Sequence, residues 1–406
     1  MGVARSVVVI KIGGSCLSEG RTIKTIVEKI EKVKRKGLLP VLVVSALKGM
    51  TDSLMDVAVY TQNKNGPSHI DNIISEGEQL SARILESALN NKNLKAKAIS
   101  VNNDFPIVTD NQYGQAEILL DETNKRTKNK LKPLINKGII PIVPGFIGKT
   151  KDNRTTTIGR GGSDTTAVVI GSILKPKEVI LLKDVAGILS ADPKVVKDAK
   201  KLKTITVEEA LNLSIKGGEV LCQSSLMFKP KDVNVRIVNY DNGDLLTSGT
   251  VVIGTLEKDI DVKLSERKVA AVSVIGKRMD SMPGLLGKFS NHLAKADINI
   301  FSISASKYSI CFYVSQSNRK KALQTLHNLV QKENDLTAVT SIENISLVTV
   351  TGRDFAIRKG VLGKIGNVLA KHNINIVDIS TSGCESAILV NNQEAKRVKK
   401  ILEVSL

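Results

Sequence analysis

The stretch of residues 155–166, TTTIGRGGSDTT, is the best candidate for a ligand-binding site. Its glycines let the backbone approach a ligand without a side chain in the way, and an apolar helix pattern follows at once. Ser163 or Asp164 is expected to cap that helix, whose first N–H groups would then face an anion. Arg160 adds a planar fork that suits a carboxylate or a phosphate. The pattern predicts an anion-binding site, with an ordinary turn before a core helix as the alternative.

A second glycine turn, Lys11-Ile12-Gly13-Gly14-Ser15, directly follows an apolar run at residues 7–10 that reads as a buried strand. A lysine at the end of a strand, beside two glycines, suits the phosphates of a nucleotide. The spacing matches neither a Walker A loop nor a GxGxxG fingerprint. By itself this turn is weak evidence, because a tight strand-to-helix turn with a solvated lysine would have the same sequence.

Residues 1–260 alternate between strand-like and helix-like patterns. Amphipathic patterns predict helices at residues 23–36 and 79–90, and apolar runs predict strands at residues 7–10, 40–44, 98–101, 139–143, 179–182 and 235–238. Continuous apolar strands separated by helices indicate a mostly parallel sheet with helices on both faces. Ligands bind such sheets at the carboxyl ends of the strands, and both glycine turns lie at such ends.

The last part of the chain contains an internal duplication, because residues 269–314 align with residues 345–390 at a constant offset of 76 without a gap. Glycines, a Leu-Ala-Lys segment and an Ile-Asn-Ile segment all coincide, which indicates a true repeat. Each copy reads as strand, glycine turn, helix, strand, strand and helix, which predicts two ferredoxin-like β-α-β units. The charged segment 257–268 is expected to be a linker.

Composition excludes several classes of protein. The 406 residues suffice for two or three domains. Lys and Arg number 59 against 40 Asp and Glu, but the lysines are spread along helix patterns without stacking aromatics, so we expect anionic small substrates and no nucleic acid. The four cysteines show no metal spacing and look like small buried or incidental residues of a reducing compartment. No apolar run approaches the roughly 20 residues needed to cross a bilayer. We therefore expect a cytoplasmic protein.

Together these segments resemble the aspartate kinases. The resemblance covers essentially the whole chain and rests on motifs in the order of that family: Lys11-Ile12-Gly13-Gly14-Ser15, Ser75-Glu76-Gly77-Glu78-Gln79-Leu80-Ser81, Gly145-Phe146-Ile147-Gly148, Thr156-Thr157-Ile158-Gly159-Arg160-Gly161-Gly162-Ser163-Asp164 and Asp184-Val185-Ala186-Gly187-Ile188. It implies an α/β fold, the amino acid kinase fold, at residues 1–260. ACT domains, which commonly bind amino acids, would follow at residues 268–340 and 341–406. A scaffold that only pairs subunits is the alternative for the repeats.

The resemblance implies transfer of the γ-phosphoryl group of ATP to the side-chain carboxylate of L-aspartate, the first step of lysine, threonine and methionine biosynthesis. Lys11 would bridge the phosphate and the substrate, and Asp164 would orient Lys11. Arg160 would bind the α-carboxylate of aspartate, and Glu78 its α-ammonium. Mg²⁺ would lie on ATP oxygens and not directly on the protein. The other implied contacts are Gly13, Gly14, Gly161 and Gly162 for phosphate, and Ser15, Ser45, Thr51, Phe146 and Ser163 for aspartate.

The implied nucleotide contacts are Lys183, Asp184, Gly187, Leu189, Lys194 and Lys216. Several positions depart from the family's usual residues: Leu189 replaces a tyrosine, Lys194 replaces an arginine, and Glu219 replaces a lysine for which Lys216 is the candidate substitute. These departures leave nucleotide binding open.

Effectors, usually lysine or threonine in this family, would contact the first repeat at Met279, Gly284, Leu285, Leu286, Asn299 and Ile300. The repeats also imply a homodimer or a dimer of dimers. Two other functions remain possible: another enzyme of the amino acid kinase fold, acting on glutamate, acetylglutamate or a nucleotide monophosphate, and a non-catalytic amino-acid sensor. The paired repeat and the Ser-Glu-Gly-Glu segment argue against the first of these.

Overall fold

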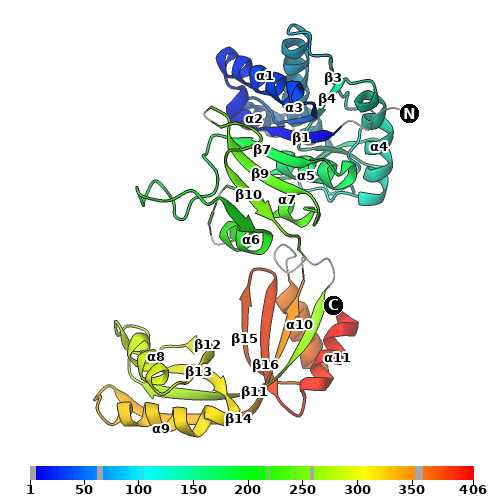
Figure 1. Cartoon of the computed structure of the whole chain (residues 1–406). Coiled ribbons are helices and arrows are strands. Elements are labelled where there is room, and N and C mark those ends of the chain that lie inside the picture. The colour runs from blue at the N-terminus through cyan, green and yellow to red at the C-terminus, as the bar shows by residue number, and fades with distance from the viewer. Residues whose placement is uncertain are drawn as a thin grey trace. The chain divides into compact units, whose positions relative to one another are not determined.

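The computed structural model describes residues 6–61, 67–102, 104–215, 217–218, 220–241, 243–256, 260–352 and 360–406. The chain divides into two compact units, Met1–Leu256 and Glu257–Leu406, each with its own sheet (Figure 1). No helix in the described part of the chain is both long and apolar enough to cross a membrane.

The first unit is built on an eight-stranded sheet in the order β3-β4-β2-β1-β7-β9-β10-β8. The first six strands in this order run parallel, and only β10 is antiparallel to its neighbour β9. Strands β1, β2 and β7 are almost wholly buried, as their continuous apolar runs predict. The strands are β1 Val7–Ile12, β2 Leu39–Val44, β3 Ala96–Ala98, β4 Ile140–Pro144, β7 Glu178–Lys183, β8 Thr204–Thr206, β9 Asn234–Asn239 and β10 Thr250–Ile253.

Helices cover both faces of this sheet, which confirms the predicted α/β fold. Helix α3 packs against β2, β3, β4 and α1, whereas α5 packs against β1, β2, β7 and α4. Figure 1 shows α1 and α3 on one side of the sheet and α5 on the other. The helices are α1 Gly20–Arg35, α2 Met50–Tyr60, α3 Pro67–Asn90, α4 Leu120–Asn136, α5 Gly162–Leu174, α6 Val207–Ile215 and α7 Gln223–Met227, with a short 3₁₀ helix η1 at Gly14–Leu17.

A small antiparallel hairpin leads the chain into α5. Its strands are β5, Ile147–Lys149, and β6, Thr155–Thr157. Both strands are fully buried, so the threonines that precede the glycine loop are packed inside the unit. The predicted strand at residues 98–101 is shorter and earlier than expected, because β3 ends at Ala98.

The second unit is a six-stranded antiparallel sheet in the order β12-β13-β11-β14-β16-β15. Helices α8 and α10 begin 76 positions apart, each after a glycine with a positive φ, which confirms the repeat read from the sequence. The elements are β11 Asp261–Gly276, α8 Leu285–Lys295, β12 Ile300–Ala305, β13 Ser309–Ser315, η2 Gln316–Asn318, α9 Arg319–Val330, β14 Leu336–Thr351, α10 Val361–Lys371, β15 Ile376–Ser382, β16 Glu385–Asn391 and α11 Ala395–Ser405.

The two repeats interlock through their long strands. The second half of β11 packs Val272 and Val274 into the core of the first repeat, whereas Val262, in its first half, packs into the core of the second. Strand β14 divides in the same way, with Leu336 in the first core and Val348 in the second. The linker expected at 257–268 is therefore wrong from Asp261 onward, because these residues form sheet.

Candidate active site

Three charged side chains meet at the carboxyl edge of the first sheet. Lys11 lies near the end of β1 and Lys183 at the end of β7, whereas Asp164 lies in the first turn of α5. The Lys11 Nζ is 2.8 Å from Asp164 Oδ1, and the Lys183 Nζ is 2.7 Å from Asp164 Oδ2. One buried carboxylate therefore binds two ammonium groups.

The register of the strands explains this meeting. Strands β1 and β7 are parallel neighbours in which Lys11 pairs with Leu181. Because side chains alternate between the two faces of a strand, Lys183 lies on the same face as Lys11. Helix α5 packs on both strands and brings Asp164 to that face. Burial raises the pKa of Asp164, but the two ammonium groups outweigh it and hold the pKa at about 2, so the carboxylate stays ionised.

The glycine loop between β6 and α5 positions Arg160 and frees backbone N–H groups. Gly159 and Gly161 have φ angles of 85° and 75°, which glycine adopts without strain. Gly161 is the N-cap of α5, so the expectation that Ser163 or Asp164 caps the helix is wrong. Both residues instead lie in the first turn, whose N–H groups have no intrahelical partner. No side chain of the described residues caps this helix end. The Gly162 N–H already donates to the Gly159 carbonyl oxygen at 2.9 Å, so the N–H groups of Ser163 and Asp164 are the ones that can bind an anion.

Cys222, just before α7, forms a hydrogen bond to the same loop through its side chain. Its Sγ donates to the Arg160 carbonyl oxygen at 3.1 Å, and the Thr165 Oγ1 donates to the Gly161 carbonyl oxygen at 3.3 Å. The Ser224 Oγ joins the two side chains, at 3.0 Å from the sulfur and 2.9 Å from the threonine oxygen. No pattern in the sequence pointed to this contact. Cys222 is only half-buried and binds the loop, so reading it as a small buried or incidental residue was wrong.

Glu78 lies in the middle of α3, not in a first helical turn, because the helix already begins at Pro67. The side chain is buried, and its Oε1 accepts the Ala46 N–H at 3.2 Å. The Oε2 is also buried and has no hydrogen-bond partner among the described residues. Burial raises the pKa of Glu78 to about 7, although the Ala46 N–H opposes this. A buried carboxylate oxygen without a donor is a binding position for a cationic ligand group.

One cavity of about 550 Å³ brings most of the predicted residues together. The predicted residues that line it are Lys11, Ser45, Thr51, Glu78, Phe146, Arg160, Gly161, Gly162, Ser163, Asp164 and Lys183. Thr157 and Gly159, from the stretch 155–166 that the sequence singled out, also line it, whereas the sequence did not point to four further lining residues: Asp52, Met55, Ile74 and Gly114. The volume is within the range of small-molecule sites. Cationic, anionic and apolar side chains together suit a small zwitterion and an anion.

Comparison with known proteins agrees with this geometry. A family model described as the amino acid kinase family matches residues 6–239, more than half of the chain. The chain belongs to the amino acid kinase family. An ACT domain model also matches residues 272–329, within the second unit.

The relatives of this amino acid kinase confirm the resemblance to aspartate kinases. It is 29% identical to an aspartokinase of Mycolicibacterium smegmatis over 415 aligned residues, which cover 98% of this chain and 95% of the relative. It is similar in structure to the aspartate kinase from Synechocystis, with a TM-score of 0.79, 22% identity and coverage of 98% of this chain and 69% of that chain. It is also similar to E. coli aspartokinase III in complex with aspartate and ADP, with a TM-score of 0.56, 23% identity and coverage of 98% and 99%. At these identities, the two structures establish the shared fold.

The glycine turn after β1 of this amino acid kinase is packed closely against neighbouring segments. Gly13 donates its N–H to the Leu182 carbonyl oxygen at 3.3 Å, so this group is already engaged. A Cβ on Gly14 would lie 2.5 Å from the Ala46 carbonyl oxygen, so close backbone packing requires glycine there. Among the described residues, the cavity lining does not include Gly13, Gly14 or Ser15. The turn therefore positions Lys11 and packs β1 against its neighbours.

Asp71 is a buried anchor beneath the cavity that the sequence did not reveal. Its Oδ2 accepts the N–H groups of Gly114 at 3.0 Å and Thr157 at 2.9 Å, and its Oδ1 accepts the Thr157 hydroxyl at 3.1 Å. Burial raises the pKa of Asp71 above its usual value, although these hydrogen bonds oppose the shift. Because Gly114 and Thr157 both line the cavity, Asp71 fixes one of its walls to α3.

The predicted nucleotide contacts are not all in one place. Lys183 lines the cavity, whereas Asp184 is exposed just after β7. Gly187, with a φ of 131°, and its neighbour Ile188 are fixed to Thr250 of β10. Beyond them, the loop that carries Leu189 and Lys194 extends away from the sheet, as Figure 1 shows in green. Lys194 is exposed, and Lys216 and Glu219 lie outside the described residues.

The predicted effector contacts form two separate groups within the first repeat. The first group lies at the glycine loop before α8, where Met279 donates its N–H to the Lys307 carbonyl oxygen. The second group lies at the start of β12. Ile300 pairs with Val314 of β13, whereas Ile275, at the end of β11 before the first group, pairs with Ser309. These two positions on β13 are five residues apart, or about 17 Å at the usual rise per residue. The six residues therefore lie at two places on the first repeat. Two of them are buried in the core, Met279 and Leu285, whereas Gly284, Leu286 and Asn299 are exposed.

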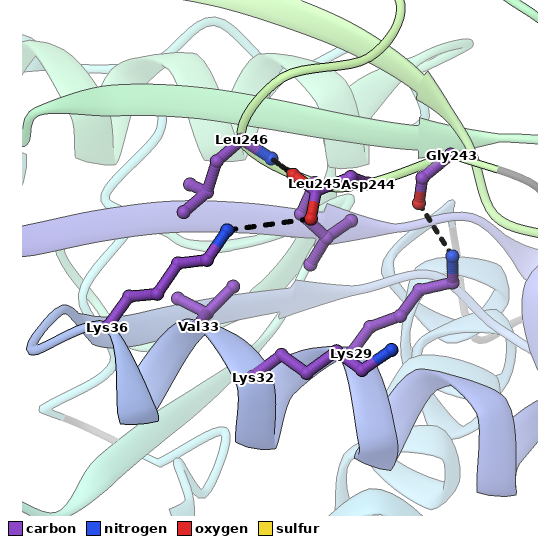
Figure 2. Close-up of a pocket in the computed structure, with 8 residues that line it drawn as sticks. All are labelled: Lys29, Lys32, Val33, Lys36, Gly243, Asp244, Leu245 and Leu246. Atoms are coloured by element: carbon purple, nitrogen blue, oxygen red, sulfur yellow. Dashed lines mark hydrogen bonds and ion pairs between the residues drawn. The ribbon is translucent and has the colours of Figure 1, made fainter.

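A second cavity, of about 200 Å³, lies between α1 and the loop at residues 243–246 (Figure 2). The Lys29 Nζ donates to the Gly243 carbonyl oxygen at 2.6 Å, and the Lys36 Nζ lies 3.6 Å from Asp244 Oδ2. Two of the lysines around it thus bind the protein itself. This cavity lies where a loop packs on a helix, and it shares no lining residue with the larger cavity.

Proposed function

We propose that this chain is an aspartate kinase, which transfers the γ-phosphoryl group of ATP to the side-chain carboxylate of L-aspartate and yields aspartyl phosphate and ADP. The observation that carries this proposal is that Lys11, Arg160 and Glu78 line a single cavity. The near full-length similarity to a relative named aspartokinase supports it.

The reaction needs charge neutralisation more than proton transfer. The nucleophile is a carboxylate, which is already ionised at neutral pH, so no general base is required. A carboxylate oxygen forms a bond to the γ-phosphorus while the bond from that phosphorus to the β,γ-bridging oxygen breaks. Both reactants are anions, so positioning and cationic groups supply the catalysis. Lys11 is placed to reduce their repulsion, and Asp164 keeps its ammonium group in position.

Arg160 and Glu78 would hold the amino acid at its two charged groups. The Arg160 guanidinium would bind the α-carboxylate through two parallel hydrogen bonds. The α-ammonium would donate to the Glu78 Oε2, the buried oxygen that lacks a partner. Phe146 would pack on the apolar side of the substrate, and the hydroxyl groups of Ser45, Thr51 and Ser163 would add polar contacts.

Magnesium would enter this site on ATP. Both oxygens of Asp164 are engaged by ammonium groups, so this carboxylate suits the orientation of lysines better than direct metal coordination. Mg²⁺ keeps several waters and is commonly bound through substrate phosphates. Bound there, it would withdraw charge from the phosphate oxygens. The N–H groups of Ser163 and Asp164 are the described backbone groups that fit a phosphate oxygen at a helix N-terminus.

We also propose that the second unit senses an amino acid end product, lysine or threonine, at the loop of residues 279–286, and that the repeats pair two chains. The ACT domain match supports sensing. Exposed apolar residues on the sheet, such as Ile303, Ile342 and Val377, support pairing. The phosphorylated product would feed lysine, threonine and methionine biosynthesis. Steady-state rates that do not change with either amino acid at millimolar concentration would exclude this regulation.

A coupled ADP-release assay with aspartate, with glutamate and without an acceptor tests the proposed activity. We expect turnover with aspartate only, and near-complete loss in Lys11→Ala and Arg160→Ala. The matched controls are Lys24→Ala and Arg21→Ala, which remove exposed charges of the same kind from α1. Trapping the product with hydroxylamine would identify an acyl phosphate. Comparable turnover with glutamate would contradict the proposal.

A further inference from the structure

Lys183 is a second buried cation that the reaction as described above does not use. Its ammonium group binds Asp164 Oδ2, on the other side of the carboxylate from the ammonium of Lys11. Both lysine side chains are largely buried, at 10% and 17% exposed, and the carboxylate between them is 4% exposed. Two cations and one anion leave a net positive charge at this position.

An unbalanced positive charge in a buried position is unfavourable without a further anion. Moving an ammonium group out of water is strongly unfavourable unless a counter-charge compensates. Asp164 can compensate only one of the two lysines, because it carries a single charge. The cavity that opens onto both ammonium groups is the place from which a second anion would come.

The position of Lys183 distinguishes it from the rest of the predicted nucleotide contacts. Lys183 shares a cavity with Arg160 and Glu78, which we assign to the amino acid. Lys194, by contrast, is exposed on a projecting loop. Lys11 and Lys183 lie on the same face of adjacent parallel strands, so a group between the two strand ends faces both ammonium groups. Lys183 thus faces the place where the two substrates would meet.

We propose that Lys183 is a second catalytic cation, which contacts the γ-phosphoryl group during transfer opposite Lys11, with Asp164 as the brace that holds both. This inference rests on the proposed function and changes the assignment of Lys183 from the nucleoside end of ATP to the transferred group. As the carboxylate oxygen binds phosphorus and the bond to ADP breaks, the two ammonium groups neutralise oxygens of the phosphoryl group. Neither lysine loses a proton. The pKa of Asp164, lowered to about 2 by both lysines, keeps the brace ionised throughout.

The test compares nucleotides that differ in the γ-phosphoryl group. Calorimetric titration with Mg²⁺ and either AMP-PNP or ADP would be carried out on the wild-type protein, Lys183→Ala and Lys183→Arg. A lost charge-assisted contact weakens AMP-PNP binding by about tenfold or more in Lys183→Ala, while ADP binding stays the same. Lys183→Arg should recover part of the loss because it keeps the charge. Lys177→Ala is the matched control, an exposed lysine just before the same strand.

Turnover gives the second measurement. We expect Lys183→Ala to reduce kcat about 100-fold or more, with the KM for aspartate changed by less than about threefold. Equal weakening of ADP and AMP-PNP would overturn the inference, since it would place Lys183 at the nucleoside or its first two phosphates. A raised KM for aspartate with unchanged nucleotide binding would overturn it in favour of a substrate contact. The binding arm needs no acceptor, so a wild-type protein inactive with aspartate would contradict the proposed function alone.

Discussion

Replacing Glu78 by glutamine should stabilise the substrate-free protein at alkaline pH and abolish aspartate binding. Glu78 is 2% exposed, and only one of its oxygens accepts a hydrogen bond from a described residue. Burial raises its pKa from 4.5 to about 7, because the charged form loses hydration that one Ala46 N–H does not replace. The ionised Glu78 side chain therefore destabilises the folded protein, and a substrate ammonium group would remove this destabilisation.

The magnitude follows from the linkage between ionisation and folding. Between the unfolded pKa of 4.5 and the folded pKa of about 7, the folded protein binds more protons at Glu78 than the unfolded chain. Its stability consequently falls as the pH rises through this interval, and the loss is complete above the folded pKa. A pKa raised from 4.5 to about 7 corresponds to about 3 kcal/mol. Glutamine does not ionise, so Glu78→Gln should escape this loss.

Urea unfolding of the first unit at several pH values would measure the effect. At pH 8 we expect Glu78→Gln to be more stable than the wild type by up to about 3 kcal/mol, with the difference vanishing near pH 4. Glu76→Gln, exposed on the same helix, is the matched control and should show no such trend. In the wild type, kcat/KM for aspartate should rise with pH and level off above about 7, as Glu78 ionises. A stability difference independent of pH, or normal aspartate binding by Glu78→Gln, would refute the reasoning.

Further substitutions test the loop and its anchor. Arg160→Lys should raise the KM for aspartate by about tenfold or more with a smaller change in kcat, because lysine cannot form the paired hydrogen bonds; steady-state kinetics would show it. Gly161→Ala should lower both stability and kcat/KM, since a left-handed residue with a Cβ costs about 1–2 kcal/mol and this Cβ would lie 2.4 Å from that of Cys222. Adding Cys222→Gly should recover part of the loss, and no recovery would show that backbone strain alone is responsible. Asp71→Ala should reduce the unfolding free energy by about 2 kcal/mol or more, because buried N–H groups lose their acceptor. A change below about 0.5 kcal/mol in urea unfolding would show that water replaces the carboxylate.

The sequence was sufficient to predict that Lys11, Asp164 and Arg160 belong together. Apolar runs separated by amphipathic stretches predict a parallel sheet, and the carboxyl ends of parallel strands lie at one edge of it. The first glycine turn lies at such an end, but the second follows the antiparallel hairpin of β5 and β6, so it was the resemblance to aspartate kinases that implied a shared site for their charged residues. The contact of Lys183 with Asp164 could not be predicted in this way. It depends on the register of β7 against β1, which a sequence pattern does not specify.

Other features depended on packing that local patterns do not encode. The Gly13 N–H was expected to bind phosphate, but the adjacent strand offers it the Leu182 carbonyl oxygen. The helix predicted at residues 79–90 begins earlier, at Pro67, so Glu78 lies inside α3. Charged residues at 261–268 suggested a linker, although alternation lets one face of a strand remain polar while Val262 is buried. Each of these outcomes was decided by a neighbouring element distant in the sequence.

The cavity contains two opposite departures from charge balance, and together they describe its ligands. At Asp164 two ammonium groups surround one carboxylate, which leaves an excess of positive charge. At Glu78 a buried carboxylate oxygen lacks a donor, which leaves a deficit of positive charge. A single simple ion could correct only one of these. A zwitterion whose ammonium reaches Glu78, next to a phosphate that reaches the two lysines, corrects both at once. The empty site is therefore less stable than the filled one, and binding energy from both substrates acts at the point where their charges would otherwise repel.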